Sequence, residues 1–169
     1  MNGADELKKA DFSLARKDDP RLMALVARTD HKILAAWAIG CALRVLPFFE
    51  EKYPGDPRPR NALAVLRNWI KTGVFKMSVI RKASLGSHAA AREVGEDSPA
   101  RSAARAAGQA VATAHVPTHC IGAANYALQA VFRAADSSDA GAAVERERAW
   151  QFRRLLDLRK KTKKNGRAA

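Results

Sequence analysis

The stretch 98-SPARSAARAAGQAVATAHVPTHCIGAANYALQAVFRAAD-136 decides the fold, because it is rich in alanine and has a helical pattern throughout. Ser98 is a candidate N-cap, with Pro99 at the first helical position. A further proline interrupts the pattern near the middle of the stretch. The sequence therefore predicts two helices, over residues 98–116 and 118–135.

The small side chains of these two helices determine how they pack. One face of the first helix is built from Ala103, Ala107, Val111 and Ala114, and Gly108 borders it. Small residues bury little apolar area, which is worth roughly 25 cal/mol per Å², but they let helix axes approach closely. We therefore expect this alanine- and glycine-rich helix pair at the centre of the fold, with the tryptophan-bearing helices packed over it.

The rest of the chain also has helical periodicity, and the alternating β-branched residues typical of strands are absent. In the first long helix, Pro47 is expected to introduce a kink rather than an end, because the apolar periodicity continues beyond it. The further helical segments are residues 18–29, 30–53, 57–73, 76–95 and 142–161. The sequence predicts an all-α, single-domain array of about six or seven helices around one core.

The two ends of the chain differ in composition from its central part. We expect a polar, partly disordered leader over residues 1–18, a single helical domain over residues 19–159 and a basic, disordered tail over residues 160–169. The first segment is charged and lacks the apolar region of a secretory signal, and no apolar run is long enough to span a bilayer. We therefore expect a cytoplasmic protein with no membrane partner.

The chain has two cysteines, Cys41 and Cys120, and each lies in an apolar helical pattern. They form neither a C-x-x-C pair nor a zinc-ligand spacing. Buried free thiols are the favoured interpretation in a reducing compartment, with a disulfide as the less favoured alternative.

The charge of the chain favours an acidic partner. There are 30 Lys and Arg against 17 Asp and Glu, a formal net charge of +13. The charge is uneven, because residues 153–169 hold eight bases and one acid. This basic tail is the candidate nucleic-acid element, and it would bind without sequence preference.

The segment 55-GDPRPR-60 contains the first candidate site residues. Asp56 is placed to cap the helix that follows it. Arg58 and Arg60 fall in the first helical turn, where the helix dipole disfavours cations. Acidic neighbours, within the fold or on a partner, would offset this cost. We interpret both arginines as members of salt bridges within the fold, ahead of a role in binding.

Arg44 lies on an apolar face of the first long helix, together with Trp37. A half-buried arginine needs a carboxylate partner. The candidates that lie nearby in the sequence are Glu50, Glu51 and Asp56.

Three of the four histidines lie in or near the central pair. His115 and His119 have the spacing of a helical metal pair, but Pro117 lies between them and no H-E-x-x-H glutamate is present. We interpret His115 as a core histidine, because it follows the small-residue face. His88 shares a helix face with Arg81 and Arg92, and these two charges favour a neutral imidazole if His88 is buried near them. A metal or small-molecule site formed by the three histidines is the less favoured alternative.

Four blocks of the sequence, taken in order, resemble a known family. The blocks are AAWAIGCALRVLPFFEEKYPGDPRPRNALAVLRNW, MSVIRKASLGSHAAARE, ARAAGQAVATAHVPTHCIGAANYAL and ERERAWQFRRL. Together they resemble the bacterial immunity proteins of polymorphic toxin systems. The positions that carry the resemblance are Trp37, Cys41, Arg44, Pro47, Phe49, Glu50, Tyr53, Pro54, Asp56, Arg58, Pro59, Arg60, His88, Arg92, Gly108, Gln109, His115, His119, Trp150 and Gln151.

The resemblance implies a protein that blocks a cognate toxin through a tight interface, with no catalysis, no metal and no cofactor. The positive charge suits an acidic toxin and disfavours a nuclease, whose active site is basic. A nucleic-acid-binding helical protein and a metal- or small-molecule-binding one are the alternatives. The candidate residues for partner binding or a buried polar cluster are Asp56, Arg58, Arg60, His88, Arg92, Gln109, His115, His119 and Trp150.

Overall fold

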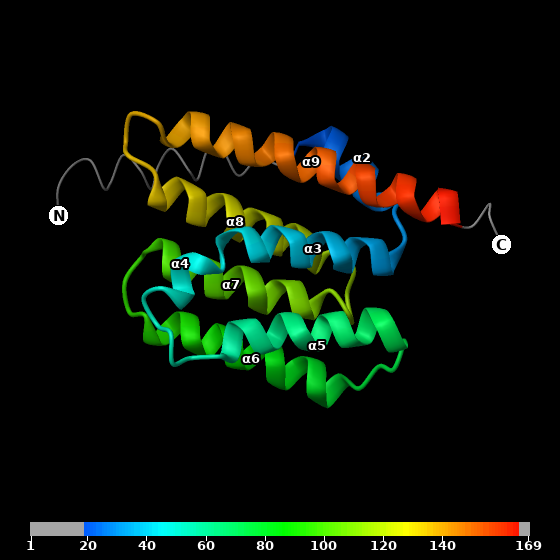
Figure 1. Ribbon diagram of the computed structural model, residues 1–169, viewed down its shortest axis with the longest axis horizontal. Coiled ribbons are helices and arrows are strands. Elements are labelled where there is room, and N and C mark those ends of the chain that lie inside the picture. The colour runs from blue at the N-terminus through cyan, green and yellow to red at the C-terminus, as the bar shows by residue number, and fades with distance from the viewer. Residues whose placement is uncertain (1–18, 166–169) are drawn as a thin grey trace.

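The computed structural model describes the backbone of residues 19–165 and the side chains of residues 19–161. Every regular element in this range is an α-helix (Figure 1), which confirms the all-α prediction. The helices are α2 (Pro20–Ala27), α3 (His31–Val45), α4 (Pro47–Glu50), α5 (Arg58–Thr72), α6 (Met77–Glu93), α7 (Pro99–Ala112), α8 (His119–Ala134) and α9 (Ala140–Asn165).

The described residues form eight helices, so the predicted number of six or seven is too low. The additional helix arises at Pro47, where one predicted helix is divided into α3 and α4. Proline has no N–H to donate along the helix, and its ring crowds the preceding turn. Leu46 nevertheless keeps helical dihedral angles, φ −55° and ψ −36°. The chain therefore bends at this point without unwinding.

Local capping residues set several helix ends, and Ser98 does so as predicted. The carboxylate of Asp19 accepts a hydrogen bond from the backbone N–H of Arg21 at 2.9 Å. The hydroxyl of Ser98 accepts one from the backbone N–H of Arg101 at 3.3 Å. Gly73 follows α5 in the left-handed conformation, with φ of +71°. These signals place the starts of α2 and α7 and the end of α5.

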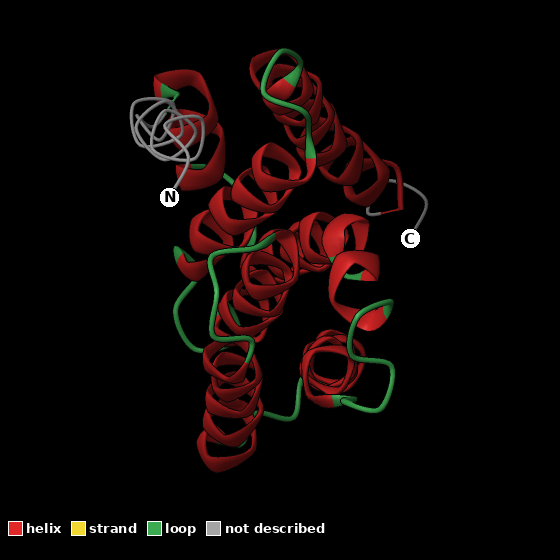
Figure 2. Ribbon diagram, turned by 90° about the vertical axis from the view of Figure 1, so that its left-hand side faces the viewer, coloured by secondary structure: helices red, strands yellow, loops and turns green. Residues whose placement is uncertain are grey.

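The alanine- and glycine-rich pair, α7 and α8, lies with α3 in the middle of the bundle. Figure 1 shows α2 and α9 on one side of these helices and α5 and α6 on the other. α7 is packed against α3, α4, α5, α6 and α8, while α8 is packed against α3, α7 and α9. Figure 2 shows the same helical bundle from its side. The prediction that the tryptophan-bearing helices α3, α5 and α9 pack over the pair is confirmed.

Small residues let α6 approach the backbone of α7. Of the 14 residues of α7, 10 are buried, and most of these are alanines. The hydroxyl of Ser84 in α6 donates to the carbonyl oxygen of Gly108 at 2.9 Å, and that of Ser87 donates to the carbonyl oxygen of Ala104 at 2.8 Å. The close packing of the two helices thus includes side-chain to backbone hydrogen bonds as well as apolar contacts.

A buried glutamine fixes α9 against α3 and α8. The indole N–H of Trp37 donates to the backbone oxygen of Gln151 at 2.8 Å. The side-chain amide of Gln151 donates to the backbone oxygen of Ala124 at 3.1 Å. A buried polar group that loses its partner costs about 1–3 kcal/mol. These two bonds therefore favour one rotation of α9 over its alternatives.

The ends of the chain are described only in part. The expected leader, residues 1–18, lies outside the described residues, as do residues 166–169. α9 continues to Asn165, so the chain is helical into the segment that the sequence analysis assigns to a basic tail. Between residues 19 and 165, no helix combines the length and the apolar composition needed to cross a membrane.

Candidate partner-binding site

One line of polar side chains runs along the otherwise buried helix α7. After Pro99, the residues of α7 that are not buried are Arg101, Arg105 and Gln109. Residues four apart lie on the same face of a helix, and we call these three residues the α7 strip. Of the three residues of the α7 strip, only Gln109 was predicted from the sequence as a candidate site residue. The spacing of four between polar residues in an alanine-rich helix is the signal that identifies the other two.

His88 of α6 packs onto α7 and contacts Arg105. A Cβ atom at Gly108 would lie 2.8 Å from the His88 ring, so glycine provides the space for the ring. Nδ1 of His88 lies 3.3 Å from Nη1 of Arg105. Burial, followed by the charges of Arg105 and Arg92, lowers the pKa of His88 to about 4. The imidazole is therefore neutral at pH 7, and its Nδ1 accepts a hydrogen bond from the guanidinium group.

Gln109 and His119 form a second polar contact, between α7 and α8. Nδ1 of His119 lies 2.8 Å from Oε1 of Gln109, which fits a neutral imidazole that carries its proton on Nδ1. The Gln109 side chain lies against Gly122, where a Cβ atom would be 2.7 Å from Oε1. Burial, and then the neighbouring His115, lowers the pKa of His119. Each of the two contacts thus places a polar side chain over a glycine of the adjacent helix.

The interpretation of His115 as a core histidine is wrong, because its side chain is exposed. α7 ends at Ala112, so His115 lies in the connection to α8 rather than on the buried face of α7. Its ring lies against that of His119, with 5.1 Å between the ring centroids. Among the described residues, no three His, Cys, Asp or Glu side chains are grouped as metal ligands. The three histidines therefore do not assemble the metal site that was the alternative interpretation.

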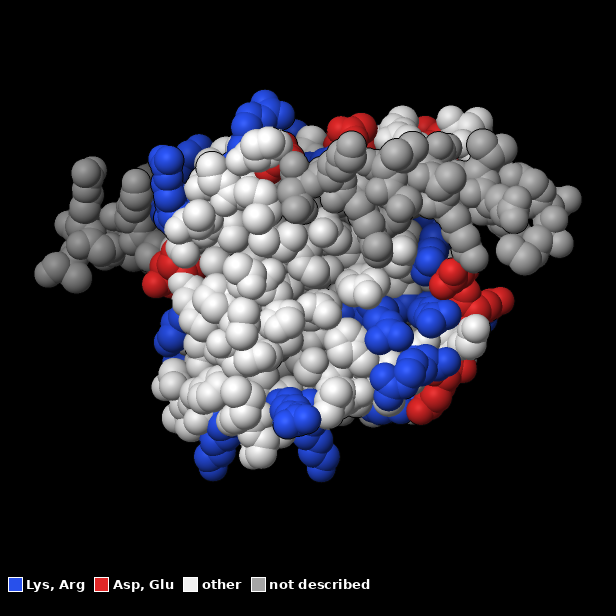
Figure 3. Space-filling view, turned by 180° about the vertical axis from the view of Figure 1, so that it is seen from behind, with Lys and Arg blue, Asp and Glu red and all other residues white. Residues whose placement is uncertain are grey.

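A polar pocket with a volume of about 330 Å³ opens beside the α7 strip. Its lining residues are Asp97, Arg101, Arg105, Tyr126, Gln129 and Arg133. Three guanidinium groups and one carboxylate give this arginine pocket a net positive charge. Figure 3 shows Lys and Arg side chains gathered at one end of the rear face, next to Asp and Glu side chains. None of the lining residues was a candidate in the sequence analysis.

The candidates at the start of α5 form ion pairs within the fold, as interpreted. The Asp56 carboxylate accepts the backbone N–H of Arg58, the first residue of α5, at 3.0 Å, although Pro57 rather than Asp56 occupies the N-cap position. The Arg58 guanidinium bonds to both Asp56 and Glu93, and Arg60 bonds to Glu50. Hydrogen bonds from these arginines lower the pKa values of all three carboxyl groups. This cluster joins α5 to α4 and α6.

Arg44 has a carboxylate partner, but on a different helix from the one expected. Nε of Arg44 lies 2.8 Å from Oε2 of Glu147, a buried residue of α9. The guanidinium carbon lies 4.2 Å from the centroid of the Trp150 ring. Trp150 thus belongs to a contact between α3 and α9. The prediction of Glu50, Glu51 or Asp56 as the partner is wrong, because proximity in the sequence carries no information about a helix 103 residues away.

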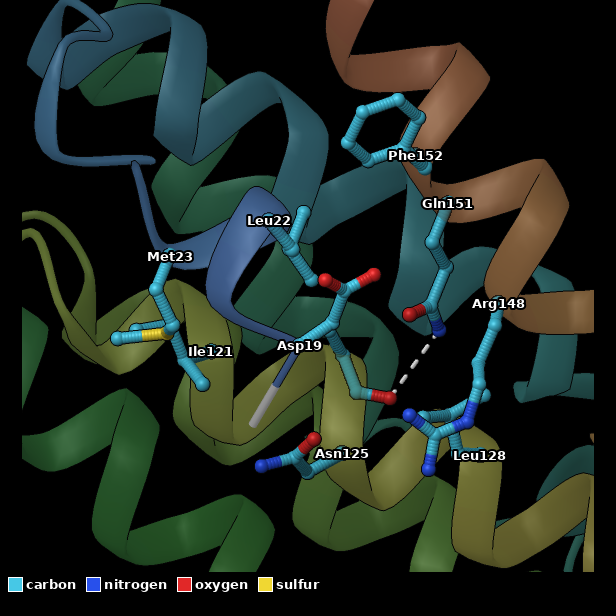
Figure 4. A pocket seen from close by; sticks show the side chains of 10 residues that line it. Asp19, Leu22, Met23, Ile121, Asn125, Leu128, Arg148, Gln151 and Phe152 are labelled. Carbon is cyan, nitrogen blue, oxygen red and sulfur yellow. Dashed lines mark hydrogen bonds between the residues drawn. The ribbon is translucent and has the colours of Figure 1, made fainter. Parts of the chain in front are cut away.

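Both cysteines are buried, and a second hollow lies between α2, α8 and α9. Cys41 and Cys120 are buried free thiols, as predicted. Burial raises the pKa of both, that of Cys120 to about 12, so neither is a thiolate at neutral pH. The hollow between α2, α8 and α9 (Figure 4) has a volume of about 40 Å³. That is room for only a few water molecules, and Gln151 closes one side through its bond to Ala124.

One protein-family model matches most of the chain. The family model described as "Imm-5 like putative immunity protein" matches residues 24–158. The matched residues include the α7 strip, the arginine pocket and the ion pairs of α5. Comparison with curated proteins and with solved structures gives no significant match.

Proposed function

Since the chain belongs to the Imm-5 like immunity protein family, we propose that it binds and neutralises a cognate bacterial toxin and does so without catalysis. The family match is the observation that carries this proposal. A protein of this kind acts by covering a functional surface of the toxin, which requires an interface rather than a cofactor. The net charge of +13 suits a toxin with an acidic surface.

An exposed apolar patch supports a role in protein binding. Val74, Phe75, Met77 and Val79, which we call the α6 patch, lie in the connection from α5 to α6 and in the first turn of α6. Their exposed fractions lie between 44% and 60%. Phe and Met are enriched at the cores of protein interfaces, which polar side chains surround. Lys76, within the same segment, is exposed and provides such a polar neighbour.

Co-expression with a candidate toxin that a neighbouring gene encodes tests the proposal. We expect the full chain to restore the growth of cells that produce the toxin. We also expect the purified chain to bind the purified toxin with nanomolar affinity in isothermal titration calorimetry. Absence of both protection and binding would refute the proposed function.

Substitution of the α6 patch tests whether it contacts the toxin. The double variant Phe75→Ser, Met77→Ser is expected to weaken binding on the order of tenfold or more, because apolar side chains at the centre of an interface carry much of its energy. Val116→Ser is the matched control, since Val116 is an exposed apolar residue in the connection between α7 and α8. We expect the control to bind within about twofold of the wild type. If both variants lost toxin affinity to the same extent, the α6 patch would not be the surface that contacts the toxin.

A further inference from the structure

We propose that the arginine pocket anchors an acidic side chain of the toxin, whose carboxylate binds the guanidinium groups of Arg101, Arg105 and Arg133. The inference rests on the proposed function and deepens it, because it names the chemistry by which the partner is recognised. The occupant is an Asp or Glu side chain that projects from the toxin surface into the pocket.

The pocket keeps a positive charge after its internal ion pairs are formed. Arg101 and Arg105 lie one turn apart on α7, and Arg133 approaches from α8. A carboxylate oxygen of Asp97 lies 3.4 Å from Nη1 of Arg101 and 3.2 Å from Nη2 of Arg133. The Asp97 carboxylate therefore serves Arg101 and Arg133, whereas Arg105 has no ion pair among the described residues.

A buried hydroxyl fixes the α8 side of the pocket before any partner binds. Nη1 of Arg133 donates to Oγ of Ser102 at 2.8 Å, and that hydroxyl donates to Oε1 of Gln129 at 3.0 Å. Ser102 is fully buried in α7. Oε1 of Gln129 is thus occupied, which leaves its amide nitrogen as a further donor for an anion. Side chains that are already ordered lose less conformational entropy on binding.

Arg105 is the arginine that an external carboxylate would satisfy. Its hydrogen bond is to Nδ1 of His88 at 3.3 Å, and it forms no ion pair with any other described residue. The neutral imidazole orients the guanidinium group without neutralising it. Arginine binds a carboxylate with two parallel, charge-assisted hydrogen bonds, which are among the strongest polar contacts in proteins.

The acidic surroundings of the pocket favour one carboxylate over a nucleic acid. Asp97 lines the pocket, while Glu93 and Glu96, at the end of α6 and in the connection to α7, pair with Arg58 and Lys52. A nucleic-acid strand carries about one negative charge per 3.4 Å, so its backbone would meet the Asp97 carboxylate as well as the arginines. A single projecting side chain avoids that repulsion.

The affinity of charge-matched variants for the purified toxin, measured by calorimetry on the full chain, tests the proposal. Arg105→Gln is expected to raise the Kd on the order of tenfold or more, because it removes a charge-assisted contact. Arg67→Gln removes the same charge from an exposed position on α5, and its Kd is expected to stay within about twofold of the wild type. Arg105→Lys keeps the charge but loses the planar guanidinium group. Its Kd is expected to lie between those of Arg105→Gln and Arg67→Gln. Thermal melting of each variant shows whether it is folded.

Each outcome bears on either the pocket or the function. If the wild type binds the toxin and Arg105→Gln binds as well as Arg67→Gln, the pocket proposal is overturned and the proposed function stands. If the wild type neither binds nor protects, the proposed function is lost, and the pocket proposal falls with it. A labelled single-stranded DNA oligonucleotide is the third probe. If Arg105→Gln abolishes DNA binding and leaves toxin binding unchanged, the occupant is a phosphate, which also overturns the proposal.

Discussion

The arginines at the start of α5 and those of the arginine pocket show two uses of the same side chain. At the start of α5, two arginines pair with three carboxylates of the chain itself. In the arginine pocket, Arg101 and Arg133 pair with Asp97, while Arg105 forms no ion pair with another described residue. The first cluster joins helices and leaves no surplus positive charge. The second leaves positive charge at an open surface, which is what recognition of an acidic partner requires.

The variant Gly108→Ala tests whether packing fixes the histidine that orients Arg105, and it is expected to have the largest effect on stability. The added Cβ would lie 2.8 Å from the ring of His88. Overpacking of this kind costs about 1–3 kcal/mol, which outweighs the gain of up to about 1 kcal/mol from replacing a helical glycine. We expect a lower free energy of unfolding in urea titrations.

Gly86→Ala is the matched control for this substitution. Gly86 lies within α6, and a Cβ atom there would meet nothing within 4 Å. The same change is therefore expected to stabilise the protein by up to about 1 kcal/mol. If both alanine variants are more stable than the wild type, His88 is not held by packing and its contact with Arg105 is incidental.

The pH dependence of stability separates the two regions. Burial and the charges of Arg105 and Arg92 lower the pKa of His88 to about 4 in the folded protein, from 6.5 in the unfolded chain. The unfolded chain therefore takes up this proton first, and stability falls as the pH is lowered from 6.5 to 4. We expect a loss of roughly 1–2 kcal/mol, allowing for the partial exposure of the ring. In the variant His88→Gln, the urea midpoint of unfolding is expected to change less between pH 6.5 and 4 than in the wild type. An equal change in the two proteins would refute the assignment of this pH dependence to His88.

The ion pairs of α5 titrate in a lower range. Hydrogen bonds from Arg58 and Arg60 lower the pKa values of Asp56 and Glu50 below 3.8 and 4.5, the values in the unfolded chain. The two carboxylates make their full contribution to the free energy of unfolding above these unfolded pKa values, and this contribution is lost as the pH falls below them. Arg58→Gln is expected to reduce the loss of stability in this acid range. The slope between pH 6.5 and 4, which His88 and His119 set, is expected to stay unchanged.

At neutral pH, Arg58→Gln is expected to have the smallest effect of these changes. The Arg58 side chain is 34% exposed, and exposed ion pairs contribute little because water and salt screen them. We expect the Tm to fall by about 1–3 °C in calorimetry, with toxin affinity unchanged. A fall of more than about 10 °C would show that the α5 cluster is a major source of stability.

Most of the fold could be predicted because it depends on neighbours in the sequence. Ser98 and Gly73 act on backbone groups within a few residues of themselves, so their roles are visible without a structure. The alanine-rich faces likewise indicate close helix packing from composition alone. Pro47 was expected to kink one helix rather than end it, whereas the structure ends α3 at Val45 and begins α4 at Pro47.

The candidate site depended on contacts between distant helices, which the sequence does not display. Arg44 pairs with Glu147 across 103 positions, so the nearby acids were the wrong choice. His115 is exposed because α7 ends three residues before it. Arg101 and Arg105 were overlooked because each is an ordinary helical residue on its own. Their importance appears only when α8 brings Arg133 and Gln129 beside them.

The affinity of Arg105→Gln and Arg58→Gln for the purified toxin, measured side by side, tests the central claim that one cluster binds and the other holds the fold. Arg105→Gln is predicted to weaken binding on the order of tenfold or more, with Arg58→Gln within about twofold of the wild type. A large loss in Arg58→Gln together with wild-type affinity in Arg105→Gln would contradict the claim.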